Sequence, residues 1–417
     1  MKPRIFPDEL LRSLAREHGT PLYVYDAATI RARTAELAGF DRVRYAQKAN
    51  SNLAVLRLVH SLGAEIDAVS AGEIARARAA GFEPHEIVFT ADVFDRAALD
   101  SLASELVPVN LGSPFMIEQY AALLRTLDTT HLAHDPRRIT LRVNPGFGHG
   151  HARKVNTGGE ESKHGLWHAD LQAAIERAAH AGLSVAGLHV HIGSGADFEH
   201  LACVCDAMKS LAPVVGDTLE RISAGGGLSI PYRPGEARLD IARFTREWLT
   251  TRAAIASQLG REIALEVEPG RYLVAESGVL LAEVRGTKRM GALEYVFIDA
   301  GFHTLLRPAL YGAYHAISVV GQDANATGTP KVIAGPLCES GDVLTQRSGG
   351  ELDPRALPDM QEGDIVCIHD AGAYGASMAS GYNSQPLPAE VLVDGTQHEL
   401  VRRRQSIEDL LRDECGR

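Results

Sequence analysis

The chain has 417 residues, which exceeds what one hydrophobic core usually supports, so two domains are expected. Its 42 lysine and arginine residues against 53 aspartate and glutamate residues give a net charge of −11, which disfavours nucleic acid or an anionic membrane and favours a small molecule as partner. The 5 cysteines lack the spacing of metal ligands, which indicates free thiols and no metal site. The absence of a signal-like or membrane-length apolar run predicts a cytoplasmic protein.

The first strand candidate is the stretch PLYVYDA, residues 21–27. It precedes the repeating part of the chain, and residues 1–28 are predicted as an N-terminal segment whose strand joins a C-terminal β domain.

A repeating pattern follows from about residue 43 to residue 270, where short β-branched runs alternate with Ala-, Leu- and Arg-rich segments of helical period. Eight such runs begin at Val43, Ala64, Ile87, Leu106, Ile139, Val185, Arg221 and Glu262. They predict a (β/α)8 barrel over residues 29–277, although a doubly wound sheet would share the pattern.

Chemically unusual residues end most of these runs, at Lys48, Asp67, Asn144, His191, Gly225 to Gly227 and Glu268. Barrel enzymes carry their chemistry at the C-terminal ends of the strands, so this distribution favours a closed barrel.

The sequence pattern changes after about residue 278. From there, strand candidates follow one another without regular helices: GVLLAEVRGTK, YVFIDAG, HAISVV, KVIAGP, DIVCIHD and AEVLVDG. Residues 278–417 are therefore predicted as a separate, mainly antiparallel β domain.

Lys48 is the first candidate for chemistry, because it follows an apolar strand. An amine held partly unprotonated there can form a Schiff base with an aldehyde cofactor. Most lysines are solvated surface charges, so Lys48 gains weight only from its companions.

The AGGGL stretch around Gly225 to Gly227 can turn backbone N–H groups around an anion, which suggests a phosphate cradle, with an ordinary turn as the alternative. Ser194 in HIGSG offers a hydroxyl to the same phosphate. His191 can lie flat against a planar ring; His189 points to the same side of the strand, but His191 is nearer its C-terminal end.

Glu268 in the EPGR stretch can pair with a protonated pyridine nitrogen and keep a cofactor ring an effective electron sink. Arg271, Arg307 and Tyr311 offer donors suited to carboxylates, although each could instead be structural.

The CESGD stretch combines Cys338, whose thiol can give a proton, with Glu339, whose carboxylate can accept a hydrogen bond from a substrate ammonium. Tyr374 is flanked by small residues that allow close backbone approach to a ligand.

The order Lys48, HIGSG, AGGGL, EPGR, CESGD, AGAYG resembles the fold-type III pyridoxal-phosphate decarboxylases, most closely their diaminopimelate branch. Longer strings such as FIDAGFHTLLRPALYGAYH and GAYGASMASGYNSQPLPAEVL carry this resemblance over nearly the whole chain. It implies an alanine racemase-like fold and pyridoxal 5′-phosphate as the cofactor.

The resemblance also implies individual roles. Lys48 holds the cofactor, His191 stacks on its ring and Glu268 meets the pyridine nitrogen. The phosphate is served by Ser194, Gly225, Gly226, Gly227, Arg271 and Tyr374. The substrate is contacted by Arg271, Arg307, Tyr311, Glu339 and Tyr374.

The implied reaction is decarboxylation of meso-2,6-diaminopimelate to L-lysine and CO2, the last step of bacterial lysine synthesis. Cys338 is the predicted proton donor, with Lys48 second. The resemblance further implies a homodimer with shared active sites, in which Cys338 and Glu339 come from the partner chain.

One local departure is Lys163-His164-Gly165, where many relatives have Lys-Phe-Gly, so the role of His164 is open. Two alternatives also remain: a decarboxylase of ornithine, arginine or carboxynorspermidine, and a non-catalytic regulatory homologue.

Overall fold

The computed structural model describes residues 5–130, 132–148, 157–193, 198–323 and 328–414. The chain folds into two compact units. The barrel unit consists of residues 32–229 and 239–272, and the sheet unit of residues 1–31, 230–238 and 273–417.

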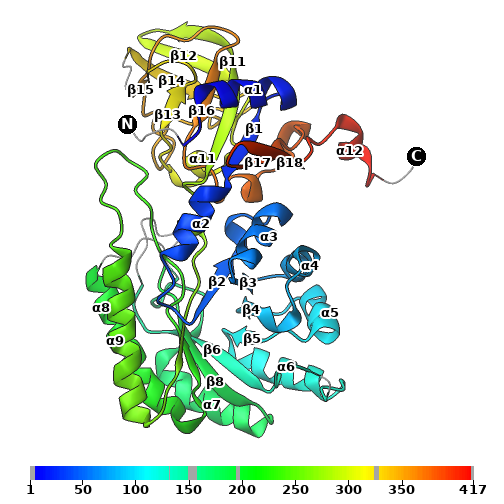
Figure 1. Ribbon diagram of the computed structural model, residues 1–417, viewed down its shortest axis with the longest axis vertical. Coiled ribbons are helices and arrows are strands. Elements are labelled where there is room, and N and C mark those ends of the chain that lie inside the picture. Colours follow the sequence, from blue (N-terminus) through cyan, green and yellow to red (C-terminus); the bar gives the residue numbers. More distant parts are fainter. Residues whose placement is uncertain (1–4, 131, 149–156, 194–197, 324–327, 415–417) are drawn as a thin grey trace. The chain divides into compact units, whose positions relative to one another are not determined.

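The barrel unit is built on eight parallel strands that close on themselves (Figure 1). They are β2 (Arg42–Ala46), β3 (Glu65–Ala68), β4 (Ile87–Ala91), β5 (Val109–Leu111), β6 (Arg138–Asn144), β8 (Ser184–Val190), β9 (Arg221–Ser223) and β10 (Ala264–Val267). Each strand pairs with the next, and β10 returns to β2. The predicted barrel is confirmed, and the closure rules out the doubly wound sheet. The short strand β7 (Leu166–Trp167), which was not predicted, pairs with the end of β6.

Helices connect the strands, and several begin at a residue that caps the first free N–H groups. Asn52, Ser70, Asp95 and Asp240 accept these hydrogen bonds at the starts of the helices that begin at Leu53, Ala71, Arg96 and Ile241. The helices are α2 (Ala27–Ala35), α3 (Leu53–Ser61), α4 (Ala71–Ala80), α5 (Arg96–Glu105), α6 (Pro114–Leu124), α7 (Leu171–His180), α8 (Phe198–Val215), α9 (Ile241–Leu259) and α10 (Arg271–Val274). Figure 1 shows α8 and α9 side by side on the outside of the barrel.

The sheet unit contains one mixed sheet. Its strands are β1 (Leu22–Asp26), β11 (Gly278–Met290), β12 (Leu293–Ile298), β13 (Ile317–Val319), β14 (Pro330–Ala334), β15 (Arg355–Ala356), β16 (Ile365–Ile368), β17 (Ala389–Asp394) and β18 (Gln397–Arg402). The ladders are antiparallel except those of β1 with β17 and of β12 with β14. The predicted, mainly antiparallel β domain is therefore confirmed.

Strand β1 lies inside this sheet, between β11 and β17. Val24 is opposite Val279 on one side and Val391 on the other. Helix α1 (Asp8–His18) buries Leu11 and Leu14 in the same apolar cluster as these valines. The N-terminal segment is thus an integral part of the sheet unit. Two short helices, α11 (Arg307–Tyr311) and α12 (Ile407–Leu411), complete it.

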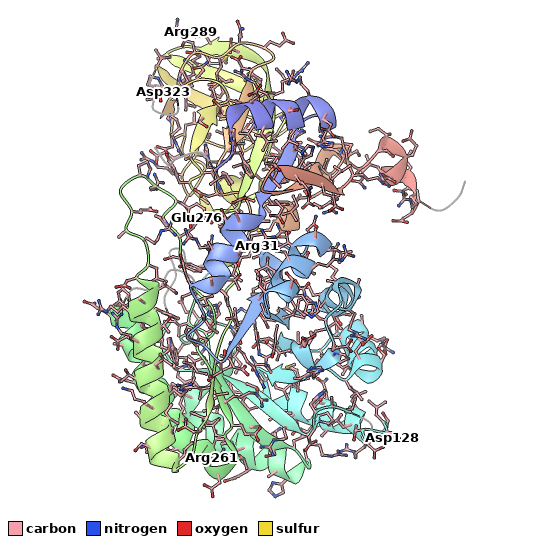
Figure 2. The ribbon with its side chains drawn as sticks, in the orientation of Figure 1. Arg31, Asp128, Arg261, Glu276, Arg289 and Asp323 are labelled. Atoms are coloured by element: carbon pink, nitrogen blue, oxygen red, sulfur yellow. The ribbon has the colours of Figure 1, made fainter. Side chains whose placement is uncertain are left out.

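The segment Ile230–Arg238, which follows β9 in the chain, also belongs to the sheet unit. Arg238 forms a two-pronged ion pair with Glu276, at 2.8 and 2.6 Å (Glu276 is labelled in Figure 2). Arg233 lies over the ring of Tyr314, 4.6 Å from its centroid. The predicted range 29–277 did not single out this segment. Within the described part of the chain, no helix is long and apolar enough to cross a membrane.

Candidate active site

Lys48 lies directly after β2, in a single 3-10 turn (Gln47–Ala49), with 48% of its side chain exposed. Its Nζ is 3.9 Å from Oδ2 of Asp67, which is buried in β3. Burial raises the pKa of Asp67, and the Glu268 carboxylate raises it further, while the Lys48 ammonium lowers it. The amine is therefore held beside a carboxylate at the C-terminal end of the barrel strands.

The three glycines after β9 pack so closely that no larger residue fits. A Cβ on Gly225 would lie 2.5 Å from the Val190 oxygen, and one on Gly227 would lie 2.3 Å from the Gly193 oxygen. Both glycines also have positive φ angles, of 61° and 91°. A Cβ on Gly226 would lie 2.5 Å from the Glu268 oxygen. The sequence AGGGL therefore forms a tight turn in which no side chain covers the backbone of the three glycines.

His191 follows β8 and contacts this turn. The Gly226 amide donates a hydrogen bond of 3.3 Å to Nδ1 of His191, so this nitrogen carries no proton. Desolvation, and then the charges of Arg142 and Lys48, lower the pKa of His191 well below its usual range. The ring is thus neutral, which suits stacking on an aromatic cofactor.

Glu268 directly follows β10 and is buried with two hydrogen-bond donors. His189 Nε2 lies 2.7 Å from Oε2, and the Ser223 hydroxyl donates to Oε1 at 2.8 Å. Burial raises the pKa of Glu268, but His189 and Ser223 outweigh it and lower the pKa to about 2. The site therefore holds a fully ionised carboxylate in a desolvated position, which suits a cationic partner such as a protonated pyridine nitrogen.

His189 is a functional residue whose role sequence reasoning missed. That His189 and His191 point to the same side was visible in the sequence, but nothing there indicated that His189 would meet Glu268, the residue after β10. Its Nδ1 is buried and has no hydrogen-bond partner among the residues that the structure describes.

Asn144, at the end of β6, ties down the following loop. Its Oδ1 accepts hydrogen bonds from Gly146 and Gly159, and its Nδ2 donates to the oxygens of Gly159 and His164. His164 Nδ1 in turn bonds Oδ2 of Asp92. Structurally, then, His164 fixes this loop to the end of β4, where phenylalanine could make no such bond.

Arg271 is the first residue of α10 and is partly buried. Ser194, the predicted phosphate ligand in HIGSG, lies outside the described residues.

Arg307 begins α11 in the sheet unit and is buried. Its Nη1 donates to His315 Nε2 at 2.9 Å, and its Cζ lies 4.7 Å from the centroid of the Tyr232 ring. His315 Nδ1 lies 2.8 Å from the His369 oxygen, which makes Nδ1 the donor and leaves Nε2 as the acceptor. The guanidinium is thus oriented by two residues that sequence reasoning missed. Tyr311 ends the same helix and is partly buried.

The CESGD loop exposes Cys338 and Glu339. The Cys338 amide donates to Asn383 Oδ1 at 3.0 Å, and the Tyr382 hydroxyl donates to Glu339 Oε1 at 2.7 Å. Asp342 anchors the loop, because its buried carboxylate accepts hydrogen bonds of 2.7 and 2.8 Å from backbone amides. The thiol of Cys338 and the carboxylate of Glu339 therefore belong to consecutive residues of a loop that hydrogen bonds hold in place.

Tyr374 has a φ of 57°, a conformation that residues other than glycine seldom adopt outside functional sites. At the next residue, a Cβ on Gly375 would lie 2.7 Å from the Tyr23 hydroxyl. Gly375, which follows Tyr374, is thus required by close packing.

The predicted site residues fall into two groups. The barrel unit carries Lys48, His191, Gly225, Gly226, Gly227, Glu268 and Arg271. The sheet unit carries Arg307, Tyr311, Cys338, Glu339 and Tyr374.

The barrel group fits pyridoxal 5′-phosphate. The Lys48 amine suits the aldehyde of the cofactor, and the neutral His191 imidazole suits the face of its ring. The ionised Glu268 carboxylate suits the pyridine nitrogen, and the turn of Gly225 to Gly227 suits the phosphate. Two of the three glycine amides already donate within the protein, Gly225 to Ser223 and Gly226 to His191. The glycine turn therefore suits the phosphate mainly because it leaves space for it.

Comparisons with known proteins agree with this fit. Residues 28–275 match the pyridoxal binding domain of pyridoxal-dependent decarboxylases. Diaminopimelate decarboxylase of Escherichia coli is 50% identical over 97% of this chain and 96% of its own length.

Two solved structures are similar over the whole fold. A crystal structure of diaminopimelate decarboxylase has a TM-score of 0.91 and 49% identity, and covers 98% of this chain and 97% of its own. The Helicobacter pylori enzyme complexed with L-lysine has a TM-score of 0.84 and 30% identity, and covers 96% and 98%. The chain therefore belongs to the pyridoxal-dependent decarboxylases and, among them, to the diaminopimelate decarboxylase family.

Proposed function

We propose that the protein converts meso-2,6-diaminopimelate to L-lysine and CO2, the last step of lysine biosynthesis, with pyridoxal 5′-phosphate as its cofactor. The reaction class rests on one observation, the buried and ionised Glu268 held by His189 and Ser223. Such a carboxylate favours the protonated form of a pyridine ring, and that form stores the electron pair left when CO2 departs. The choice of substrate rests on the identity with diaminopimelate decarboxylases over nearly the whole chain.

When bound, the cofactor supplies an aldehyde for the substrate amine and a ring that withdraws electrons from the breaking bond. Lys48 holds it through the side-chain amine, and Asp67, 3.9 Å away, keeps a counter-charge for the ammonium. His191 supports the ring and the glycine cradle holds the phosphate, together with Ser194, Arg271 and Tyr374.

The substrate has a second amino acid end, and we assign its recognition to Arg307, Tyr311, Glu339 and Tyr374, with Arg271. Arg307 is already fixed by His315 and Tyr232, so it can receive a carboxylate without reordering. Ornithine and lysine lack the distal carboxylate. When one of them binds, a buried hydrogen-bond donor meant for that carboxylate has no partner, which weakens binding by about 1–3 kcal/mol.

After CO2 is lost, the carbon that carried it must gain a proton. We propose the Cys338 thiol as the donor and Lys48 as the second candidate. Cys338 and Glu339 are exposed on the single chain, which is consistent with their serving the site of a second copy in a homodimer. A cytoplasmic location stays a prediction.

The deciding experiment supplies the cofactor-loaded protein with meso-diaminopimelate, L-lysine, L-ornithine, L-arginine and carboxynorspermidine separately, and measures released CO2 and the amine product. Release from diaminopimelate alone, with L-lysine formed, is the expected result. A preference for another amino acid would remove the substrate assignment, and no release despite bound cofactor would favour the regulatory homologue.

A further inference from the structure

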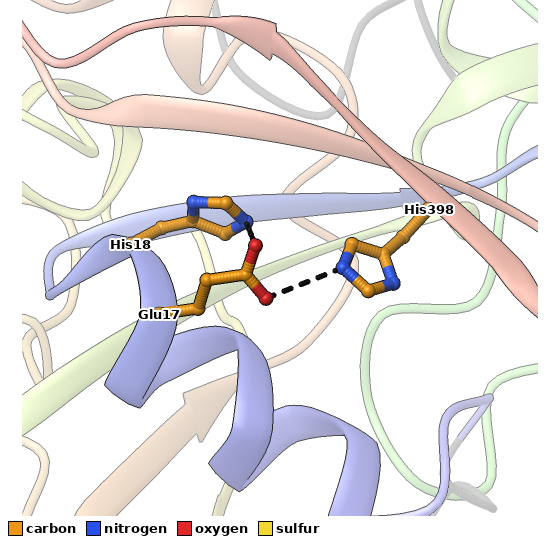
Figure 3. A group of neighbouring side chains, drawn as sticks. All are labelled: Glu17, His18 and His398. Atoms are coloured by element: carbon orange, nitrogen blue, oxygen red, sulfur yellow. Dashed lines mark ion pairs between the residues drawn. The ribbon is translucent and has the colours of Figure 1, made fainter.

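Glu17, His18 and His398 meet on the sheet unit, away from every residue assigned above (Figure 3). Glu17 and His18 end helix α1, and His398 lies on β18. His18 Nε2 is 3.4 Å from Oε1 of Glu17, and His398 Nε2 is 3.4 Å from Oε2. One potential ligand atom from each residue lies within 4.8 Å of the other two.

These separations are those of metal ligands rather than of hydrogen bonds. An N–H···O bond is usually about 2.7–3.2 Å long, so both pairs are too far apart for good bonds. Zinc binds histidine nitrogen and carboxylate oxygen at about 2.0–2.2 Å, which places neighbouring ligand atoms of a tetrahedron about 3.3–3.6 Å apart. The two pairs use different oxygens of Glu17, so one pair at 3.4 Å fits an edge of such a tetrahedron, and the ligand atom of the third residue lies within 4.8 Å of the other two.

A second observation also points to a ligand. The side chain of His18 is only 12% exposed, and its Nε2 is buried without a hydrogen-bond partner among the described residues. A buried polar atom in this state calls for a bound ion or water. Figure 3 shows this nitrogen and the facing nitrogen of His398 on either side of the Glu17 carboxylate.

The end of α1 and the Glu17 carboxylate both contribute negative charge to the cluster. The C-terminal end of a helix carries a partial negative charge, and Glu17 and His18 are the last two residues of α1. Arg404 takes the His18 carbonyl oxygen at 3.3 Å and the Pro21 oxygen at 2.8 Å, so it orders the backbone after the helix.

We propose that Glu17, His18 and His398 bind one zinc ion or a similar first-row divalent ion. Two imidazoles and one carboxylate suit such an ion better than magnesium or calcium, which prefer oxygen. The exposed side of the cluster leaves the fourth position to water. The ion would link the end of α1 to the hairpin of β17 and β18. The proposal departs from the sequence expectation of no metal site, which considered only the spacing of the cysteines.

The test uses untagged, cofactor-loaded protein that has been dialysed against a chelator and then equilibrated with zinc chloride. Bound metal is counted by mass spectrometry for the wild type and for Glu17→Gln and His398→Gln. The matched control is His180→Gln, because His180 is also exposed but lies on α7, where its Nδ1 contacts the Glu176 oxygen. The wild type and the control should each hold one zinc ion per chain more than the two cluster variants.

Two further measurements identify the site. Cobalt in place of zinc should give the visible bands of a tetrahedral ion in the wild type and not in His398→Gln, and zinc but not magnesium should raise the midpoint of thermal unfolding. Equal zinc in the wild type and both cluster variants, or equal stabilisation by magnesium, would overturn the proposal. Turnover of diaminopimelate should be the same in His398→Gln and the wild type, so the result is independent of the proposed reaction.

Discussion

The charge of Glu268 depends on its neighbour His189. His189 is the main reason why the pKa of this buried carboxylate lies near 2 instead of above its usual value. The carboxylate is therefore ionised at every pH at which the enzyme would normally be assayed.

Replacing His189 should shift the acid side of the activity profile. In His189→Asn, burial would dominate and raise the pKa of Glu268 from about 2 to above its ordinary value, so kcat/KM should show an acid limb from this group within the measured pH range that the wild type lacks. Above the new pKa, turnover should approach the wild-type value. Rate measurements between pH 4.5 and about pH 9 would check this. His180→Asn, on the barrel exterior, is the control, and an unchanged acid side of the profile in His189→Asn would contradict the role assigned to His189.

Gly226 tests the cradle, because its backbone is not in the left-handed region and only contact forbids a side chain. In Gly226→Ala the new Cβ would collide with the Glu268 carbonyl, and we expect cofactor affinity to fall by about tenfold or more. Titration of the apoprotein with pyridoxal phosphate, followed by absorbance, measures it.

Gly72→Ala is the matched control. Its Cβ would meet nothing closer than the Ser70 hydroxyl, at 3.9 Å. Alanine in this helical position should leave cofactor affinity unchanged and add up to about 1 kcal/mol of stability. Equal affinity in both variants would argue against a tight cradle at Gly226.

The candidate residues that sequence could locate are those that end buried strands, because a polar residue closing an apolar run is conspicuous. Lys48, His191 and Glu268 are of this kind. Tyr232 and His315, which hold Arg307, are not, because their meeting depends on a loop that reaches the sheet unit from the middle of the barrel sequence.

At the scale of elements, the eight barrel strands were predictable because short β-branched runs alternate regularly with segments of helical period. Strand β18 was missed for the opposite reason. Strand β18 lies at the edge of the sheet, and its sequence QHELVR is exposed at nearly every position. It therefore has no apolar pattern from which a strand could be predicted. The two-residue strands β7 and β15 are too short to carry a pattern.

Helix α1 belongs to the sheet unit through a buried face. Leu14 is fully buried in the cluster with β1, β11 and β17, so Leu14→Ala should lower the free energy of unfolding by about 2–5 kcal/mol. Urea unfolding followed by circular dichroism measures the difference. Leu400→Ala, on exposed β18, should change stability by less than about 0.5 kcal/mol, and a loss equal to that of Leu14→Ala would contradict this packing.

At the scale of the whole molecule, the sequence predicted a barrel over residues 29–277 and a β domain that the N-terminal strand joins, but it did not indicate that residues 230–238 belong to the sheet unit. The sheet unit draws on three separate stretches, and the boundary of the middle one, residues 230–238, is set by the Arg238–Glu276 pair and by ring contacts. Such pairings between distant residues leave no local signal.

The proposed homodimer with shared sites can be tested by mixing inactive subunits. A Lys48→Ala chain and a Cys338→Ala chain should each be inactive alone. If Cys338 serves the site of the other subunit, random exchange gives mixed dimers with one intact site each, and about a quarter of the wild-type activity should return. No recovery, with exchange verified by mass spectrometry, would place Lys48 and Cys338 of one site on one chain.

The interior place of β1 has a consequence for how the protein is made. Val24 leaves the ribosome long before Val279 and Val391, the two residues that must flank it. The barrel strands, by contrast, pair largely with neighbours in chain order and can assemble during translation. The apolar strand LYVYD therefore waits unpaired through most of synthesis, and it is the segment on which a chaperone would act.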